Sequence, residues 1–161
     1  MAEFQICPLD IEDREWVTQF IAERWGAEFI VAHGKVYYPR ELAGFVAITN
    51  ARRAGLVSYV IEQKDCEIIS LDSLEPTKGI GTALIEAVKE IAQKQGCERI
   101  WLTTTNDNLN ALRFYQKRGF ELVTIHKNAV EITRRYKPIP LTGADGIPIR
   151  DEIELELMIE N

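Results

Sequence analysis

The sequence has few cysteines, no long apolar run and no excess of basic residues. Its 161 residues contain only three cysteines, Cys7, Cys66 and Cys97, and no C-x-x-C pair. An odd number of cysteines without a pairing motif does not describe a disulfide framework. We therefore expect buried free thiols in a reducing cytosol, and no bound metal.

The absence of an apolar run long enough to cross a bilayer, and of a signal peptide, excludes a membrane partner and predicts a cytoplasmic protein. The formal net charge of −6 opposes nucleic-acid binding, which favours a basic surface, and is compatible with a cationic or amine substrate. Hydrophobic residues make up 46% of the chain and charged residues 27%. This composition and length predict one globular domain over residues 1–161.

The apolar spacing predicts a mixed α/β fold. Strands are expected at 4–8, 28–32, 36–38, 42–49, 56–63 and 66–74, with a helix at 11–24 that Asp10 caps and Gly26 ends. A long helix ending at Gly96 precedes a strand at 98–104, a helix at 108–118 and a strand at 120–125. Asn128 is expected to cap a helix through Tyr136. The last strand, 150–159, alternates apolar residues with glutamates, which is typical of a half-exposed closing strand.

The stretch from Leu71 to Ala92 runs from the end of an apolar strand, through Lys-Gly-Ile-Gly, into the long amphipathic helix. The first amides of a helix lack intrahelical acceptors, and the helix dipole leaves that end partly positive. Gly79 and Gly81 remove side chains that would keep an anion away, and Lys78 adds a positive charge. A phosphate or pyrophosphate is the ligand that this arrangement favours.

Other phosphate-binding signatures fit this turn less well. The P-loop string G-x-x-x-x-G-K-[ST] does not occur, and a dinucleotide fingerprint would need a small residue where Leu84 stands, which opposes a nicotinamide-dependent oxidoreductase. A bare G-x-G is also common in ordinary strand-to-helix turns. A second motif is needed to decide.

The second motif is NLNALRFYQKRGF, residues 108–120. It resembles the pattern N-x-x-A-x-x-x-Y-x-x-x-G-F of the GNAT superfamily of N-acetyltransferases, and it follows the glycine-turn helix at the distance typical of that family. The resemblance implies a GNAT-like fold: a mixed, mostly antiparallel sheet with a splayed central parallel pair and flanking helices. It also implies that acetyl-CoA is bound.

By this resemblance, the glycine turn would hold the pyrophosphate and the strand 66–74 the acetyl carbonyl and pantetheine. The family usually has Gln or Arg where this chain has Pro76, and Lys78 would replace that basic contact. The implied cofactor-binding residues are Leu71, Ser73, Leu74, Lys78, Gly79, Ile80, Gly81, Thr82, Ala83, Asn106, Asn108, Ala111, Phe114 and Tyr115.

Acetyl transfer to an amine needs an acid for the leaving sulfur, a stabilised oxyanion and a base for the amine proton. Tyr115 matches the family's tyrosine, and a phenol with an ordinary pKa near ~10 is protonated at neutral pH. The base is left open between Glu67, Asp72 and a water. Strand alternation places Glu67 and Asp72 on opposite faces, and we prefer Glu67 because its position resembles that of the base in some family members.

The resemblance implies that the acceptor is a primary amine on a small molecule or a peptide, and the sequence does not choose between them. The competing class is a non-catalytic module of the same fold that binds or senses acyl-CoA; the retained Tyr115 opposes it. A homodimer is compatible with the family pattern and the alternating terminal strand. The motifs assign no role to residues 127–150.

Overall fold

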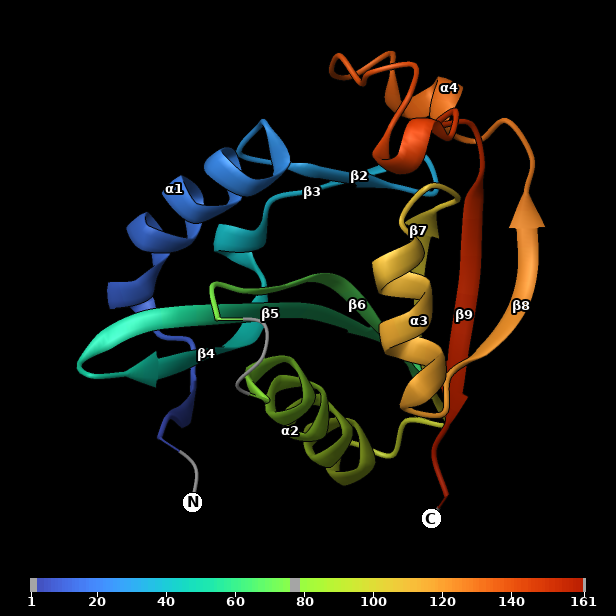
Figure 1. Ribbon diagram of the computed structural model, residues 1–161. Helices are drawn as coiled ribbons and strands as arrows, with labels where there is room; N and C mark the ends of the chain where they lie inside the picture. The colour runs from blue at the N-terminus through green and yellow to red at the C-terminus, as the bar shows by residue number, and fades with distance from the viewer. Residues whose placement is uncertain (1–2, 76–78, 161) are drawn as a thin grey trace. The chain divides into compact units, whose positions relative to one another are not determined.

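The structure, a computed structural model, describes residues 3–75 and 79–160 (Figure 1). By its internal contacts the chain forms two compact units. The first comprises Met1–Ile30, Tyr37–Ile100 and Ile159–Asn161, and the second Val31–Val36 and Trp101–Met158. Pro76 and Lys78, on which the sequence analysis relied, lie outside the described residues.

An antiparallel meander forms the first unit, as expected. Its strands β1 (Gln5–Pro8), β4 (Ala43–Thr49), β5 (Arg52–Glu62) and β6 (Asp65–Ser73) lie in the order β1-β4-β5-β6, each antiparallel to its neighbour. β5 begins four residues earlier than predicted because Asn50 and Ala51 alone form the turn. Both have positive φ, 49° and 61°, which is the conformation that a two-residue hairpin loop requires.

Helix α1 (Arg14–Trp25) follows a 3-10 turn, η1 (Ile11–Asp13), whose start is capped as predicted. The Asp10 carboxylate accepts from the Glu12 amide at 2.8 Å, and the Asp13 carboxylate accepts from the Asp10 amide at 2.9 Å. The helix ends at Gly26, which adopts a φ of 79° that glycine tolerates.

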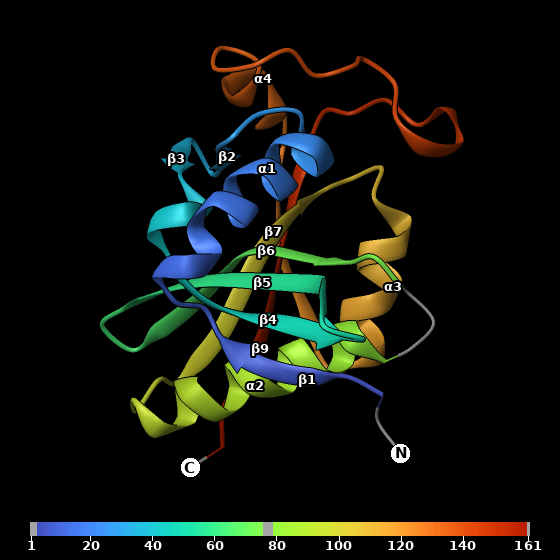
Figure 2. The ribbon, with the colours of Figure 1, turned by 90° about the vertical axis from the view of Figure 1, so that its left-hand side faces the viewer.

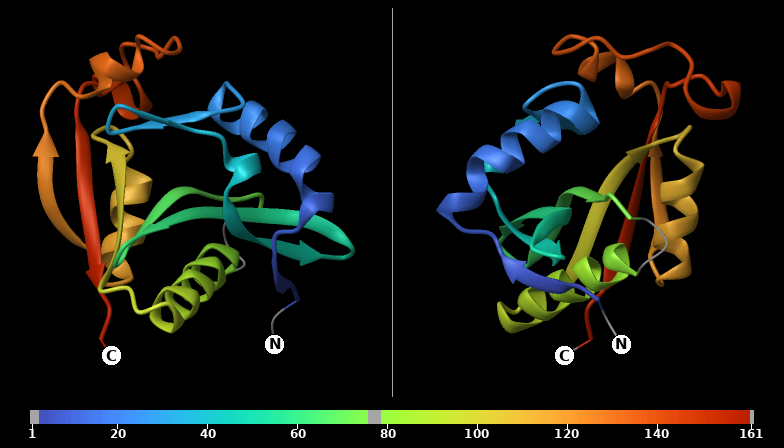
Figure 3. Two further views of the ribbon diagram at one scale, coloured as in Figure 1. Left: turned by 180° about the vertical axis from the view of Figure 1, so that it is seen from behind. Right: turned by 60° about the vertical axis from the view of Figure 1, so that its left-hand side comes forward.

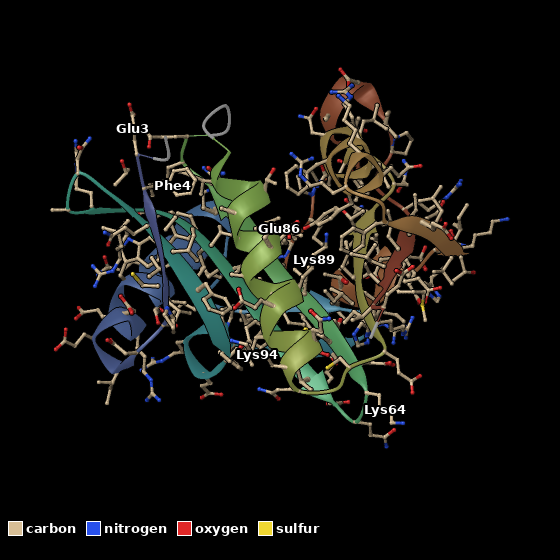
Figure 4. All side chains as sticks on the ribbon, turned by 90° about the horizontal axis from the view of Figure 1, so that it is seen from below. Glu3, Phe4, Lys64, Glu86, Lys89 and Lys94 are labelled. Atoms are coloured by element: carbon tan, nitrogen blue, oxygen red, sulfur yellow. The ribbon has the colours of Figure 1, made fainter. Side chains whose placement is uncertain are left out.

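Helix α2 (Ile80–Lys94) lies on the side of this meander opposite to α1 (Figures 1 and 2). Ile80, Leu84 and Val88 are fully buried on its inner side. Ile80 and Leu84 can approach the backbone of β5 because Gly55 has no side chain. A Cβ at Gly55 would lie 2.8 Å from a methyl group of Ile80. Charged residues of α2, among them Glu86, Lys89 and Lys94, lie on the side of the helix that Figure 4 shows. Glu90 and Lys94 form an ion pair there at 3.2 Å.

The second unit contains most of β7 (Arg99–Thr105), together with β9 (Glu152–Met158) and β8 (Glu121–His126), in the order β7-β9-β8. Helix α3 (Leu109–Lys117) runs beside these strands, and α4 (Val130–Thr133) lies beyond the end of β8 (Figure 3). Strands β2 (Ile30–Ala32) and β3 (Lys35–Tyr37) form a small separate sheet. Two further 3-10 turns are η2 (Pro39–Glu41) and η3 (Ala144–Gly146).

Two predictions for the late part of the chain are wrong. Asn128 does not cap a helix through Tyr136: it has a φ of 61°, and α4 ends at Thr133. Strand β9 is not the closing strand of the sheet, because it lies between β7 and β8. Its half-exposed character holds at Glu154 and Glu156, whereas Glu152 is buried and one of its carboxylate oxygens accepts from the His33 amide at 3.1 Å.

The fold class is confirmed as mixed α/β, with mostly antiparallel strands and flanking helices. Cys66 and Cys97 are buried free thiols, as expected, whereas Cys7 is only half-buried. Burial, followed by the nearby Cys97 and Glu67, raises the pKa of Cys66 to about 12, so this thiol stays protonated. Among the described residues, no helix combines the length and the apolar character needed to span a membrane.

Leu84→Ala should destabilise the protein by about 2–5 kcal/mol, because it removes a fully buried side chain and leaves a cavity between α2 and β5. Denaturant unfolding measures the difference. Lys94→Ala, on the exposed side of the same helix, is the control and should change stability by at most about 0.5 kcal/mol. Equal losses for the two variants would contradict the packing described here.

Candidate functional site

Strand β6 carries an extra residue that changes which side chains share a face. Ser70 pairs with Ser58 of β5 and Ile68 pairs with Tyr59, so Ile69 is left over as a β-bulge. Directly paired residues lie on the same face of a sheet. Glu67 and Asp72, which pair with Val60 and Leu56, therefore share one face with Ser70. The prediction that these two carboxylates point to opposite faces is wrong.

That face lies on the α1 side of the meander, away from α2. Gly55 and Tyr59 belong to the opposite face, and it is Gly55 that Ile80 and Leu84 of α2 approach. Between the two carboxylates, the hydroxyls of Ser58 and Ser70 hydrogen-bond to each other at 2.5 Å in the buried interior. The α1 side of β6 is thus a row of polar groups held within an otherwise apolar sheet.

Glu67 is buried, with 6% of its surface exposed, and the Tyr37 hydroxyl donates to its Oε1 at 3.0 Å. Tyr37 is equally buried. Burial first, and then the charge of Glu67 and the hydrogen bond to it, raise the pKa of Tyr37 above its ordinary value. The Tyr37 phenol therefore keeps its proton, and can donate a hydrogen bond, at any pH at which the protein would be assayed. No sequence pattern links these two residues, which stand thirty positions apart.

Asp72 is held by the end of α1. The Trp25 indole Nε1 donates to Asp72 Oδ2 at 2.8 Å, and the Arg24 guanidinium lies 3.7 Å from Oδ1. Burial raises the pKa of Asp72 above its ordinary value of 3.8, and this effect outweighs the lowering by Trp25 and Arg24. Asp72, a candidate base in the sequence, is therefore a carboxyl with two partners from the end of α1.

The backbone amides at the end of β6 do not all point the same way. The Leu74 amide donates to the Ala54 carbonyl at 2.8 Å, so it is used within the meander. Amides alternate in direction along an antiparallel strand, so those of Leu71 and Ser73 point away from β5. Of the residues predicted to bind cofactor through this strand, Leu71 and Ser73 retain that geometry and the Leu74 amide does not.

The amino end of α2 is open, as the sequence predicts. Gly79 adopts a φ of 81°, and a Cβ built on it would meet nothing within 4 Å. The Ala83 amide donates to the Gly79 carbonyl at 3.0 Å, so the amides of Ile80 and Gly81 precede the first helical hydrogen bond. Among the described residues of the first turn none is acidic. Thr82 and Ala83 complete this turn, and Lys78 is outside the described residues.

The other predicted cofactor residues belong to the second unit. Asn108 caps α3, its Oδ1 accepting from the Ala111 amide at 3.1 Å. Tyr115 of α3 is 7% exposed, and its ring meets Phe114 and Phe120 edge-on at centroid distances of 5.1 and 5.2 Å. The Arg118 guanidinium stacks 3.6 Å from the centroid of the Phe114 ring. The direction of the Tyr115 ring is thus fixed by two aromatic neighbours.

Asn106 has a structural role that the sequence analysis missed. Its Oδ1 accepts from the Arg150 and Asp151 amides at 3.0 and 2.9 Å, and its Nδ2 donates to the Pro148 carbonyl at 2.9 Å. Both ends of the side-chain amide therefore hold residues 148–151. The geometry gives Asn106 an anchoring role, and its assignment to the cofactor site stays a prediction.

Arg134 holds the same late segment from the other side. Its guanidinium donates to the Ile139, Pro140 and Ile149 carbonyls at 3.4, 3.0 and 2.8 Å. Arg150 forms two hydrogen bonds with the Asp151 carboxylate, both at 3.0 Å. Arg134 and Arg150 thus form hydrogen bonds within this late segment of the chain.

Comparisons with known proteins agree with this architecture. A model of the Acetyltransferase (GNAT) family matches residues 2–120. The uncharacterized protein YdhI of Bacillus subtilis is 46% identical over 149 residues, which cover 91% of this chain and 93% of that protein.

Two solved structures have the same fold at low identity. An IAA acetyltransferase from Bacillus cereus superimposes with a TM-score of 0.73 at 23% identity, covering 96% of this chain and 99% of its own. A Bacillus subtilis acetyltransferase in complex with CoA gives a TM-score of 0.69 at 20% identity, covering 99% and 100%.

Asp72→Asn tests the raised pKa of this carboxyl. Asp72 keeps its proton to higher pH in the fold than in the unfolded chain, so its contribution to stability is present below pH 3.8 and is lost as the pH rises through the higher folded value. Asparagine cannot ionise. The unfolding free energy of wild type minus that of the variant should therefore fall as the pH rises from 3.8 through the higher folded pKa of Asp72. A difference that rises over this range would contradict the burial effect.

Arg134→Met should loosen residues 137–150, because three backbone carbonyls lose a charged donor. We expect faster amide exchange and proteolysis there, with a stability loss on the order of 1–3 kcal/mol. Arg135→Met, at the exposed neighbouring position, is the control. Equal exchange in both variants would show that Arg134 does not anchor the segment.

Proposed function

Because the chain belongs to the GNAT family of acetyltransferases, we propose that it transfers an acetyl group from acetyl-CoA to a primary amine of a small molecule or peptide. The transfer is direct, without a covalent enzyme intermediate. Tyr115 is the acid and Glu67 the base. The resemblance in the sequence to this family is confirmed by the match over residues 2–120.

The open amino end of α2 carries the proposal. Gly79 leaves space at the helix entrance, no acidic residue occupies the described first turn, and the amides of Ile80 and Gly81 precede the helical hydrogen-bond pattern. These features suit a pyrophosphate, which needs donors and positive potential without a crowding side chain. A structure of the same fold contains CoA, which supports the choice of this ligand.

The strand before this helix supplies the remaining donors. The amides of Leu71 and Ser73 point away from β5, so either is suited to hold the acetyl carbonyl and to stabilise the negative charge that develops on its oxygen. A backbone amide in a strand is fixed before the reaction. It therefore needs little reorganisation when the charge appears.

Glu67 accepts the proton of the attacking amine, directly or through a water. Its carboxylate lies on the same face of β6 as Asp72, so an amine on the α1 side of the strand would meet negative charge from both residues. The net charge of −6 favours a cationic acceptor in the same sense. The Arg24 guanidinium lies 3.7 Å from the Asp72 carboxylate, and its positive charge opposes proton uptake there, so Glu67 is the preferred base.

Tyr115 supplies the proton that the leaving sulfur takes. The amine nitrogen forms a bond to the carbonyl carbon while the carbon–sulfur bond breaks, so one proton leaves the amine and one reaches the thiolate. Phe114 and Phe120 fix the phenol ring from two directions. A fixed acid loses less entropy at the transition state than a mobile one.

A thiol-release assay with acetyl-CoA and a panel of amines tests this function. Wild type should release CoA with at least one amine, and Tyr115→Phe should lower kcat by about 10²–10⁴-fold while CoA still binds, because only proton donation is lost. Tyr136→Phe, at a half-exposed tyrosine of the same unit, is the control and should retain the rate.

Two results would oppose the proposal. CoA binding without release on any amine would indicate the non-catalytic acyl-CoA-binding module. A Tyr115→Phe variant as fast as wild type would remove the tyrosine from the reaction and leave acetyl transfer to another acid.

A further inference from the structure

We propose that Tyr37 is a positioning residue that orients the Glu67 carboxylate for proton abstraction by donating a hydrogen bond to it, a role that rests on the proposed function above. The Tyr37 hydroxyl donates to Glu67 Oε1 at 3.0 Å, and both side chains are 6% exposed. No motif or family pattern in the sequence marks Tyr37.

Glu67 needs such a partner because it is buried. Removing a carboxylate from water disfavours its charged form, and a hydrogen-bond donor to that carboxylate restores it. A glutamate also has three side-chain torsions, so a bond to one oxygen limits the directions that the carboxylate can take. A base must be correctly directed toward the proton that it takes, and the hydrogen bond from Tyr37 to Oε1 serves this requirement.

Tyr37 is suited to a constant donor role. Burial and the charge of Glu67 raise its pKa, so the phenol keeps its proton at any pH at which acetyl transfer would be assayed. Its backbone is fixed as well: it ends β3 and is followed closely by η2, which packs against α1. The Glu41 amide donates to the Tyr38 carbonyl at 2.9 Å and closes this turn.

The hydroxyl of Tyr37 therefore acts on the reaction through Glu67. The adjacent Tyr38 provides a comparison within the same segment, because it is 44% exposed and its ring packs on Phe29, 5.9 Å between centroids. The substitution Tyr38→Phe also removes a phenol hydroxyl, but it leaves the hydrogen bond between Tyr37 and Glu67 intact.

The pH dependence of kcat/KM for Tyr37→Phe tests this role. Loss of the donor should move the acid limb of the profile to higher pH, lower kcat on the order of tenfold at neutral pH and leave KM for acetyl-CoA unchanged. Part of the rate should return as the pH rises. Tyr38→Phe should have the wild-type profile. A Tyr37→Phe variant with a wild-type profile, or one with a lower rate and no displacement of the acid limb, would overturn the inference.

Glu67→Gln separates this inference from the function on which it rests. If Tyr37 acts through Glu67, Tyr37→Phe combined with Glu67→Gln should be no slower than Glu67→Gln alone, because the two changes remove one function. A wild-type Tyr37→Phe profile together with a strongly impaired Glu67→Gln would sink the role of Tyr37 and leave the proposed function in place. A Glu67→Gln variant as fast as wild type would sink both roles.

A second variant covers the case in which Tyr37→Phe does not fold. A tyrosine with one ring fluorine, introduced at position 37 alone, keeps the hydroxyl and nearly the same size while making the phenol a stronger donor. The acid limb should then move to lower pH. Movement to higher pH, or none, would contradict the proposed hydrogen-bond control.

Discussion

The extra residue Ile69 in β6 determines which chemistry the first unit can present. In a regular strand, residues five positions apart point to opposite faces. The bulge removes that alternation between Glu67 and Asp72 and turns both carboxylates to the α1 side, with Ser58 and Ser70 bonded between them. The opposite side is left to Gly55, Ile80 and Leu84, where α2 packs.

Each carboxylate on this face is matched by an aromatic donor from a distant part of the chain. Tyr37 bonds Glu67 and Trp25 bonds Asp72, both at hydrogen-bond distance. In general, burial disfavours the charged form of a carboxyl group, whereas a hydrogen-bond donor to the carboxylate favours it. Aromatic residues suit the task because one polar atom bonds the acid while the ring contributes to the packing.

Much of the fold follows from local patterns in the sequence. The amphipathic stripe of α2, the glycine at its entrance and the Asp10 cap all appear where the spacing predicts them, because these features depend on residues a few positions apart. The family match over residues 2–120 agrees with the paired motifs.

The sequence-based predictions fail where distant parts of the chain meet. The apolar alternation of β9 could not reveal that this strand would lie between β7 and β8, or that Glu152 would be buried.

The candidate site shows the same division. Gly79 and Tyr115 are marked by motifs, whereas nothing in the sequence near Glu67 announces the bulge at Ile69 or the bond from Tyr37. Asn106 is polar and follows a strand, as a ligand residue would, yet its amide holds the backbone of 148–151. Such roles depend on contacts between residues thirty or more positions apart, which a single sequence does not encode as a local pattern.

A crystal structure of the complex with CoA tests the central claim most directly, namely that the open end of α2 binds the pyrophosphate and that the Glu67 face of β6 receives the amine. The account predicts pyrophosphate oxygens about 2.7–3.2 Å from the amides at the start of α2, with the sulfur near the end of β6 and its reactive side toward the face that carries Glu67. A pyrophosphate bound elsewhere, or a sulfur directed to the α2 side of the meander, would contradict it.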